Sequence, residues 1–238
     1  MPRIAHIRAK VAEITHHQEG LATFRLALER PAPRFKPGQF LHLALDRYDP
    51  SAHWPESRVF SIASPPEARE SLRITVSAVG EFTRRMMTLA VGDEVWVKLP
   101  YGDFVVDARP EQTSVLIAGG TGVTPFVSLL ESTQVKLGPI LVLYGARHPD
   151  LLIYRDVFEQ AVAAGRAKCR YFVQSGAGGP FEAGLPTAAV AVNAAREAGP
   201  LERAVFYVSG PPAMLERLRT DLRAAGVAAD RVRHDAWD

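Results

Sequence analysis

The chain has 238 residues, 47% of them hydrophobic, so it can form one or two domains with buried cores. Its 28 Lys and Arg residues nearly balance 26 Asp and Glu residues, and the net charge of +2 gives no support for nucleic-acid binding. Cys169 is the only cysteine, which excludes an internal disulfide and a cysteine-ligated cluster. The 7 histidines lack metal-ligand spacing, so we expect no metal site. Without a signal-peptide core or a membrane-length apolar run, we expect a cytoplasmic protein.

Apolar residues recur at every second position through the first half of the chain, a pattern that predicts half-buried β-strands. One short helix also fits this half. Many short strands with turn signals and little helix predict a small closed β-barrel. The predicted strands cover residues 4–14, 21–28, 41–45, 58–62, 72–78 and 95–99, and the helix covers residues 83–89.

The pattern changes after a polar connector at residues 107–112, where we place a domain boundary. Continuous apolar runs then alternate with helix-forming segments, which is typical of parallel strands buried on both faces. The second half is therefore predicted to be an open parallel α/β sheet, whose ligands bind beyond the carboxyl ends of the strands. The runs are residues 115–118, 140–144, 169–173 and 204–208, and the helical segments are residues 125–132, 156–164, 188–198 and 213–225.

The stretch Arg58–Pro66 combines a cation, an aromatic ring and a hydroxyl within one short predicted strand. Alternate side chains of a strand share a face, so Arg58 and Phe60 should project one way and Val59 and Ser61 the other. This arrangement suits a flat, phosphate-bearing ligand lying along the strand. An ordinary barrel strand with one exposed arginine explains these residues equally well.

A glycine-rich turn, Gly119–Pro125, connects the first buried strand of the second half to a helix. Glycine permits close backbone approach, and the helix start presents free N–H groups to an anion, so the turn is predicted to hold a phosphate. It matches neither the G-x-G-x-x-G fingerprint nor a P-loop. A tight turn with only a packing role is the alternative.

Further turns support a nucleotide site at the same sheet edge, namely Ser209–Met214 and the loop that contains Gly145 and Arg147. A solvated arginine is the alternative for Arg147. In the barrel half, Gly80–Thr83 opens the short helix and could hold a second pyrophosphate, with Arg58 as the counter-charge. Thr83 acting only as a helix cap is the alternative there.

These motifs, in this order, resemble the ferredoxin-NADP reductase family of flavoproteins, and the resemblance covers essentially the whole chain. It implies an antiparallel Greek-key β-barrel that binds flavin (residues 1–108), followed by a five-stranded parallel α/β domain that binds NAD(P) (residues 109–238). The activity implied is hydride transfer from NADH or NADPH to N5 of FAD, with FMN less expected, and electron delivery to ferredoxin, flavodoxin, or an oxygenase or redox subunit. An electron-transfer subunit of a larger complex and a regulatory nucleotide-binding module without turnover are the alternatives.

The same resemblance assigns roles residue by residue. Phe60 would lie against the isoalloxazine ring, Ser61 near flavin N5, and Ser209 beside the nicotinamide, so these three would be catalytic. The residues that would bind FAD are Arg58, Val59, Phe60, Ser61, Thr75, Val76, Ser77, Gly80, Phe82, Thr83 and Trp237. The residues that would bind the nicotinamide nucleotide are Gly119, Gly120, Thr121, Gly122, Thr124, Pro125, Gly145, Arg147, Gly210, Pro211 and Met214.

The chain departs from the family pattern at two of these positions. Phe60 stands where many members have tyrosine, which keeps stacking but loses a hydroxyl, and Ser209 stands where many have cysteine. Asp235 lies near the position of a carboxylate in some relatives, and its part in hydride transfer stays open. The choice between NADH and NADPH also stays open, because residues 174–179 contain Ser175 but no arginine.

Overall fold

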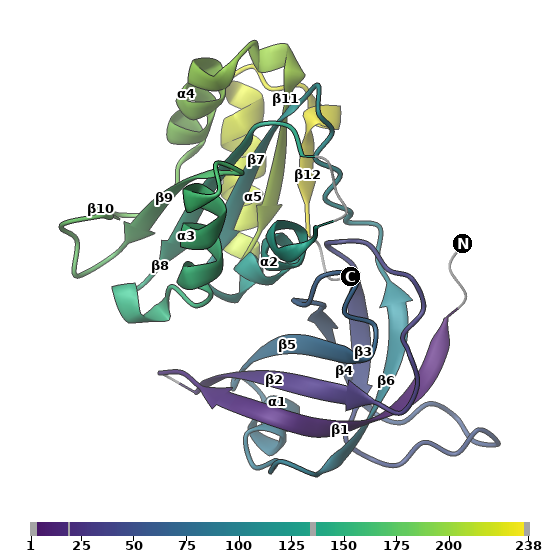
Figure 1. Ribbon diagram of the computed structural model, residues 1–238. Helices are drawn as coiled ribbons and strands as arrows, with labels where there is room; N and C mark the ends of the chain where they lie inside the picture. The colour runs from purple at the N-terminus through teal and green to yellow at the C-terminus, as the bar shows by residue number, and fades with distance from the viewer. Residues whose placement is uncertain (1–3, 19, 134–136, 236–238) are drawn as a thin grey trace. The chain divides into compact units, whose positions relative to one another are not determined.

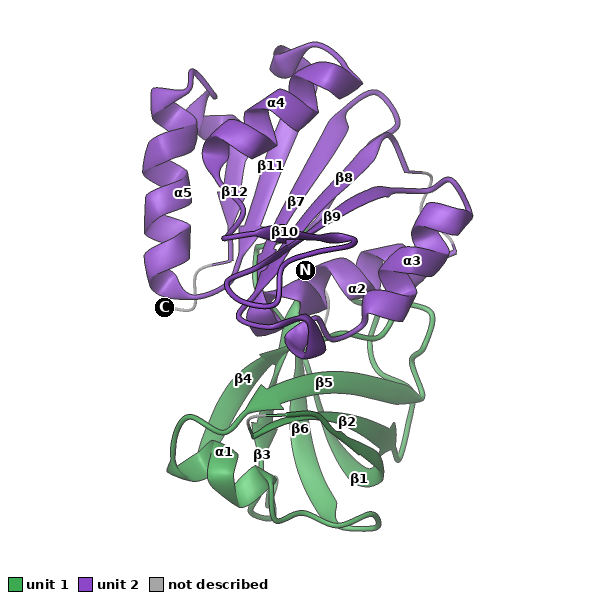
Figure 2. Cartoon of the chain, turned by 90° about the vertical axis from the view of Figure 1, so that its left-hand side faces the viewer, with its two compact units in different colours: residues 1–105 green, residues 106–238 purple. Residues whose placement is uncertain are grey.

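The computed structural model describes residues 4–18, 20–133 and 137–235, and the chain divides into two compact units, residues 1–105 and 106–238 (Figure 2). The division falls after Val105, close to the predicted boundary after Ala108. Within the described part of the chain, no helix is both long enough and apolar enough to cross a bilayer.

The first unit is a six-stranded antiparallel sheet with the order β4-β3-β6-β1-β2-β5 (Figure 1). The segment after β4 also meets β5, because the Ala63 N–H donates to the Arg73 carbonyl at 2.8 Å. The sheet is thereby nearly closed, which confirms the predicted barrel class. Its elements are β1 (Ala5–His16), β2 (Leu21–Leu28), β3 (Phe40–Ala44), β4 (Ser57–Ser61), β5 (Ser71–Ser77), α1 (Glu81–Met86) and β6 (Glu94–Tyr101).

Period-two alternation fills the interior of this barrel. On β5, Leu72, Ile74 and Val76 are fully buried in the core, whereas the intervening side chains lie on the opposite face. Phe24 and Leu26 of the neighbouring strand β2 join the same core. The barrel therefore has a core of its own, and polar side chains lie on its outer face.

The second unit is a parallel sheet with the order β10-β9-β8-β7-β11-β12 and helices on both faces. Helices α4 and α5 share one core with a single face of the central strands. Its strands are β7 (Thr113–Gly119), β8 (Ile140–Ala146), β9 (Lys168–Val173), β10 (Phe181–Ala183), β11 (Ala204–Ser209) and β12 (Val232–His234). Its helices are α2 (Thr124–Glu131), α3 (Arg155–Ala163), α4 (Ala188–Ala198) and α5 (Pro212–Ala224), with single 3₁₀ turns η1 (Gly120–Val123), η2 (Pro149–Leu151), η3 (Leu201–Arg203) and η4 (Ala229–Arg231).

The described sheet has six strands, where five were expected. The short strands β10 and β12 lie at its two edges and pair on one side only, with β9 and β11 respectively. Each has three residues and includes a charged one, so neither produces the continuous apolar run that identifies a buried strand. The α/β class itself is as predicted.

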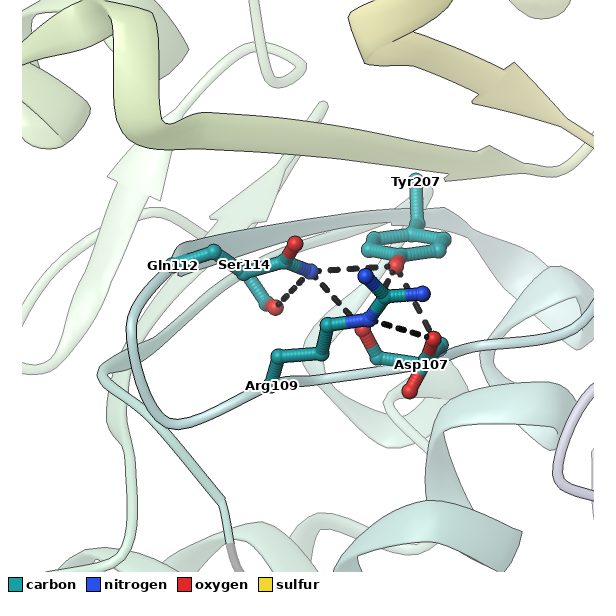
Figure 3. A network of polar contacts seen from close by, with 5 residues as sticks. All are labelled: Asp107, Arg109, Gln112, Ser114 and Tyr207. Carbon is teal, nitrogen blue, oxygen red and sulfur yellow. Dashed lines mark hydrogen bonds and ion pairs between the residues drawn. The ribbon is translucent and has the colours of Figure 1, made fainter.

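The polar connector belongs to the second unit because Tyr207 of β11 holds it (Figure 3). The Tyr207 hydroxyl donates to the Asp107 carbonyl at 3.0 Å and accepts from the Asp107 N–H at 3.3 Å. Gln112 Nε2 donates to the same carbonyl at 2.7 Å, and Arg109 pairs with the Asp107 carboxylate at 2.9 Å. These bonds fix residues 107–112 against the sheet, which explains why the division falls before them.

Candidate functional site

Arg58 lies at the start of β4, with its guanidinium beside the first turn of α1. The guanidinium carbon is 5.1 Å from the centroid of the Phe82 ring, and Phe82 itself is buried in the barrel core. Arg58 Nη2 pairs with Glu56 Oε1 at 2.8 Å, and Nη1 donates to the Ser57 carbonyl at 2.9 Å. The cation is therefore held at the surface next to the turn that was predicted to bind a pyrophosphate.

The rest of β4 becomes more buried along the strand. Phe60 is half-buried and packs against the barrel core, and Val59 is also half-buried. Ser61 is only 8% exposed at the end of the strand. Arg58 and Phe60 share one face of the strand, as predicted, because the register places them opposite Leu43 and Leu41, which both belong to the barrel core. Arg58 lies at the exposed end of that face.

The turn Gly80–Thr83 is ordered by the Thr83 hydroxyl, which accepts from the backbone N–H groups of Val79 (3.1 Å) and Gly80 (3.0 Å). The hydroxyl also donates to the Gly80 carbonyl at 3.1 Å. Thr83 therefore performs the capping role that was weighed as the alternative. A Cβ added at Gly80 would meet nothing within 4 Å, so the missing side chain leaves open space in front of the helix start.

The three predicted flavin-bordering residues of β5 differ in their surroundings. Val76 points into the barrel core and can offer a ligand only its backbone, whereas Ser77 is half-buried. The Thr75 hydroxyl lies 3.1 Å from that of Thr23, which in turn lies 3.0 Å from His17 Nε2. Burial, and secondarily His16, lowers the pKa of His17, so the hydroxyl pair borders a largely neutral imidazole at pH 7.

In the second unit, the glycines of the turn after β7 have two different roles. A Cβ at Gly119 would lie 2.5 Å from Met214 Sδ, and one at Gly122 would overlap the Ser209 carbonyl and the Gly210 nitrogen. These two glycines let the turns after β7 and β11 pack together, as the packing alternative proposed. Gly120 differs, because it has φ +54° and its added Cβ would meet nothing within 4 Å.

The remaining residues of this turn complete the transition from strand to helix. Gly120 and Thr121 lie in η1, and α2 begins at Thr124, whose hydroxyl donates to the Thr121 carbonyl at 3.0 Å. Pro125 is buried in the first turn of α2, where it needs no N–H partner. The open space at Gly120 therefore precedes an ordered helix start at the carboxyl edge of the sheet.

The loops after β8 and β9 meet at the same edge. The Ser175 hydroxyl lies 2.6 Å from His148 Nδ1, and the Ser175 N–H donates to the Arg147 carbonyl at 3.0 Å. Arg147 is exposed, whereas Gly145 allows Pro186 to pack close, since an added Cβ would lie 2.6 Å from Pro186 Cδ. His148 was missed because nothing in its local sequence marks it; only the parallel pairing of β8 and β9 brings it to Ser175.

Ser209, the last residue of β11, donates a hydrogen bond to Asp235 Oδ2 at 3.1 Å. Both residues are buried, with 2% and 3% exposure, and the Asp235 N–H bonds to the Val208 carbonyl at 2.9 Å. Burial raises the pKa of Asp235 to about 6, against a lowering effect of the Ser209 hydrogen bond. The pairing of β12 with β11 carries Asp235 to this position, while Trp237 lies outside the described residues.

Comparisons with known proteins agree with this geometry. Residues 116–220 match the model of the oxidoreductase NAD-binding domain. The chain is 31% identical over 218 residues to a probable dihydroorotate dehydrogenase B (NAD(+)) electron transfer subunit of Methanopyrus kandleri, covering 92% of this chain and 75% of that one. It belongs to the ferredoxin-NADP reductase family. A ferredoxin NADP+ reductase of Neisseria gonorrhoeae with bound FAD and NADP has a TM-score of 0.79 at 19% identity, with 97% of each chain covered.

A second relative of this family is the propane 2-monooxygenase reductase component of Rhodococcus jostii, which is 27% identical over 247 residues. The match covers 98% of this chain, but the chain spans only 64% of that relative. The family members are NAD(P)H-dependent flavoprotein reductases, and this chain belongs to that class. The predicted family, fold class and enzyme class are thereby confirmed.

The residues of the barrel fit a flavin nucleotide. The phosphates require a cation and free backbone donors, and Arg58 stands beside the open Gly80 turn, where the first N–H groups of α1 have no intrahelical acceptor. Glu56 is the residue that sequence reasoning missed here, since a carboxylate belongs to no phosphate motif.

Within the described part of the chain, no three His, Cys, Asp or Glu side chains group as metal ligands.

Proposed function

We propose that this reductase binds FAD on residues 1–105 and NAD(P)H on residues 106–238, and passes the electrons to a separate carrier protein. The observation that carries the proposal is the Arg58 guanidinium, held over the Phe82 ring next to the open turn at Gly80. When bound, FAD supplies the N5 atom that accepts hydride from C4 of the nicotinamide. The residues of the chain are required to hold the isoalloxazine and nicotinamide rings in the orientation that hydride transfer needs.

In this proposal the barrel residues bind and orient the flavin. Arg58 neutralises the phosphates, Thr83 keeps the Gly80 turn in shape, and the ring of Phe60 supports the isoalloxazine ring. Ser61 places its hydroxyl near N5. Val59, Thr75, Val76 and Ser77 line the ring and the ribityl chain with backbone atoms.

The residues at the carboxyl edge of the second unit bind the nicotinamide nucleotide. Gly120 leaves space for a phosphate in front of α2, and Thr121 and Thr124 shape that turn. Ser209 lies beside the nicotinamide, and its hydroxyl is oriented by Asp235 rather than left free to rotate. The remaining contacts come from Gly119, Gly122, Pro125, Gly145, Arg147, Gly210, Pro211 and Met214.

The acceptor is proposed to be a ferredoxin, a flavodoxin or an oxygenase. A second candidate, an electron-transfer subunit of a larger complex, is favoured by the 31% identity to the electron transfer subunit of Methanopyrus kandleri. A regulatory module without turnover is disfavoured, because Arg58, Ser61 and the open glycine turns are all kept. The single cysteine fits a reducing, cytoplasmic location.

The first test is a visible spectrum of the purified protein supplemented with FAD, followed by rapid mixing with NADH and then with NADPH. Flavin absorption bands that bleach with either donor are expected, and the faster donor identifies the preferred coenzyme. Arg58→Ala should lower the flavin content at least tenfold, because the phosphates lose their cation. If this variant retains flavin like the wild type, Arg58 does not have the assigned role.

A further inference from the structure

Glu56 is the immediate partner of the arginine proposed to bind the flavin phosphates. Its Oε1 atom lies 2.8 Å from Arg58 Nη2, and both side chains are about half exposed, at 58% and 51%. The Ser57 carbonyl holds the other terminal nitrogen at 2.9 Å. Of the five N–H groups of the guanidinium, two are thus engaged by the protein itself.

The carboxylate of Glu56 satisfies Arg58 in the same way as a phosphate oxygen would. A charge-assisted hydrogen bond to an anionic oxygen is the interaction that arginine offers to either group. A phosphate that approaches the free side of the guanidinium also approaches a carboxylate already bonded to that guanidinium. Glu56 therefore opposes the bound phosphates in two ways, by occupying a donor and by adding a like charge.

We propose that Glu56 is an intramolecular competitor of the flavin phosphates for Arg58, and that it weakens FAD binding by this chain. The proposal rests on the proposed function, because it requires the flavin phosphates to bind at Arg58. Its expected size is modest, since an exposed ion pair is readily exchanged. As a consequence, this chain should bind FAD less tightly than a variant with a neutral residue at position 56.

The test is the dissociation constant of FAD, measured by quenching of flavin fluorescence on titration of the flavin-depleted full chain. Glu56→Gln keeps a side-chain oxygen next to Arg58 but removes the charge. At low ionic strength we expect this variant to bind FAD about threefold more tightly. The gain should shrink towards zero at 1 M salt, where the screening length is about 3 Å.

Glu13→Gln is a matched control, because Glu13 is also 58% exposed and pairs with one arginine, Arg25, at 2.8 Å. Its FAD affinity should equal that of the wild type. In an Arg58→Ala background the gain from Glu56→Gln should be smaller than in the wild type, since the contested cation is gone and only the repulsion between Glu56 and the phosphates remains.

Three results would overturn the inference: unchanged or weaker FAD binding in Glu56→Gln, an equal gain in Glu13→Gln, or a full gain in the Arg58→Ala background. These results differ from a failure of the proposed function. If the wild type and every variant bind no FAD, the flavin role of the barrel itself is refuted. If Arg58→Ala loses flavin while Glu56→Gln is neutral, the function stands and the competition does not.

Discussion

Asp235 is an aspartate whose buried environment opposes its charge. Its carboxyl is 3% exposed and receives one side-chain hydrogen bond, from Ser209 at 3.1 Å. The pKa is about 6 in the folded chain and 3.8 in an ordinary exposed aspartate. The folded state therefore binds more protons than the unfolded state between these values, and the stability contributed by Asp235 is complete below pH 3.8 and lost as the pH rises through 6.

Asp235→Asn should stabilise the chain at pH 8 relative to the wild type, because the buried charge is removed while an oxygen remains for Ser209. A shift of two pKa units corresponds to about 3 kcal/mol as an upper limit. The measurement is the midpoint of thermal unfolding at pH 8 and at pH 4. The difference between the two pH values isolates the charge, since any cost of the new amide group is the same at both. An equal change at both pH values would contradict the assignment.

At the scale of an element, the turns after β7 and β11 form one packed unit. Gly122 lies in this contact, because a Cβ added there would overlap the Ser209 carbonyl. A Cβ added at Gly120 would meet nothing within 4 Å. The glycines of one short motif thus differ, since Gly122 serves packing and Gly120 borders open space. A sequence motif cannot separate them, because the contacting atoms come from a strand about 90 residues later in the chain.

Gly122→Ala should destabilise the second unit by about 1–3 kcal/mol, because backbone atoms that cannot rotate away must shift. Gly120→Ala should cost only about 1 kcal/mol, through its positive φ, but should raise the KM for NAD(P)H at least tenfold by filling the space in front of α2. Thermal unfolding and steady-state kinetics on the same preparations distinguish the two effects. Wild-type KM in Gly120→Ala would argue that the nucleotide binds elsewhere.

At the scale of the whole molecule, the sequence predicts those elements that leave a local pattern of apolar residues. Alternation identified the barrel strands, and continuous apolar runs identified β7, β8, β9 and β11, because burial on one or both faces leaves a direct mark on composition. The short edge strands β10 and β12 leave no such mark. Contacts across elements, such as those of His148 and Tyr207, depend on register and turn geometry, so no local pattern reveals them.

The two units should respond to pH in opposite directions. In the first unit, burial is the main cause that lowers the pKa values of His6, His17 and His42. The charge of Lys98 lowers the pKa values of His6 and His42 further, and His16 does the same for His17. The register pairs Lys98 with both His6 and His42, so the cation lies between them on adjacent strands. The unfolded state binds more protons here, and stability is lost as the pH falls below about 6.5.

Lowering the pH from 8 to 5 should therefore destabilise residues 1–105, while protonation of Asp235 stabilises residues 106–238. Hydrogen exchange measured peptide by peptide, and corrected for intrinsic rates, follows each unit separately. Protection of β1, β3 and β6 should fall, and protection of β7 and β11 should rise. Replacing His6, His17 and His42 by asparagine should flatten the first response, and Asp235→Asn the second. A parallel change in both units that survives these substitutions would instead assign the pH dependence to overall charge, because added positive charge weakens both units together.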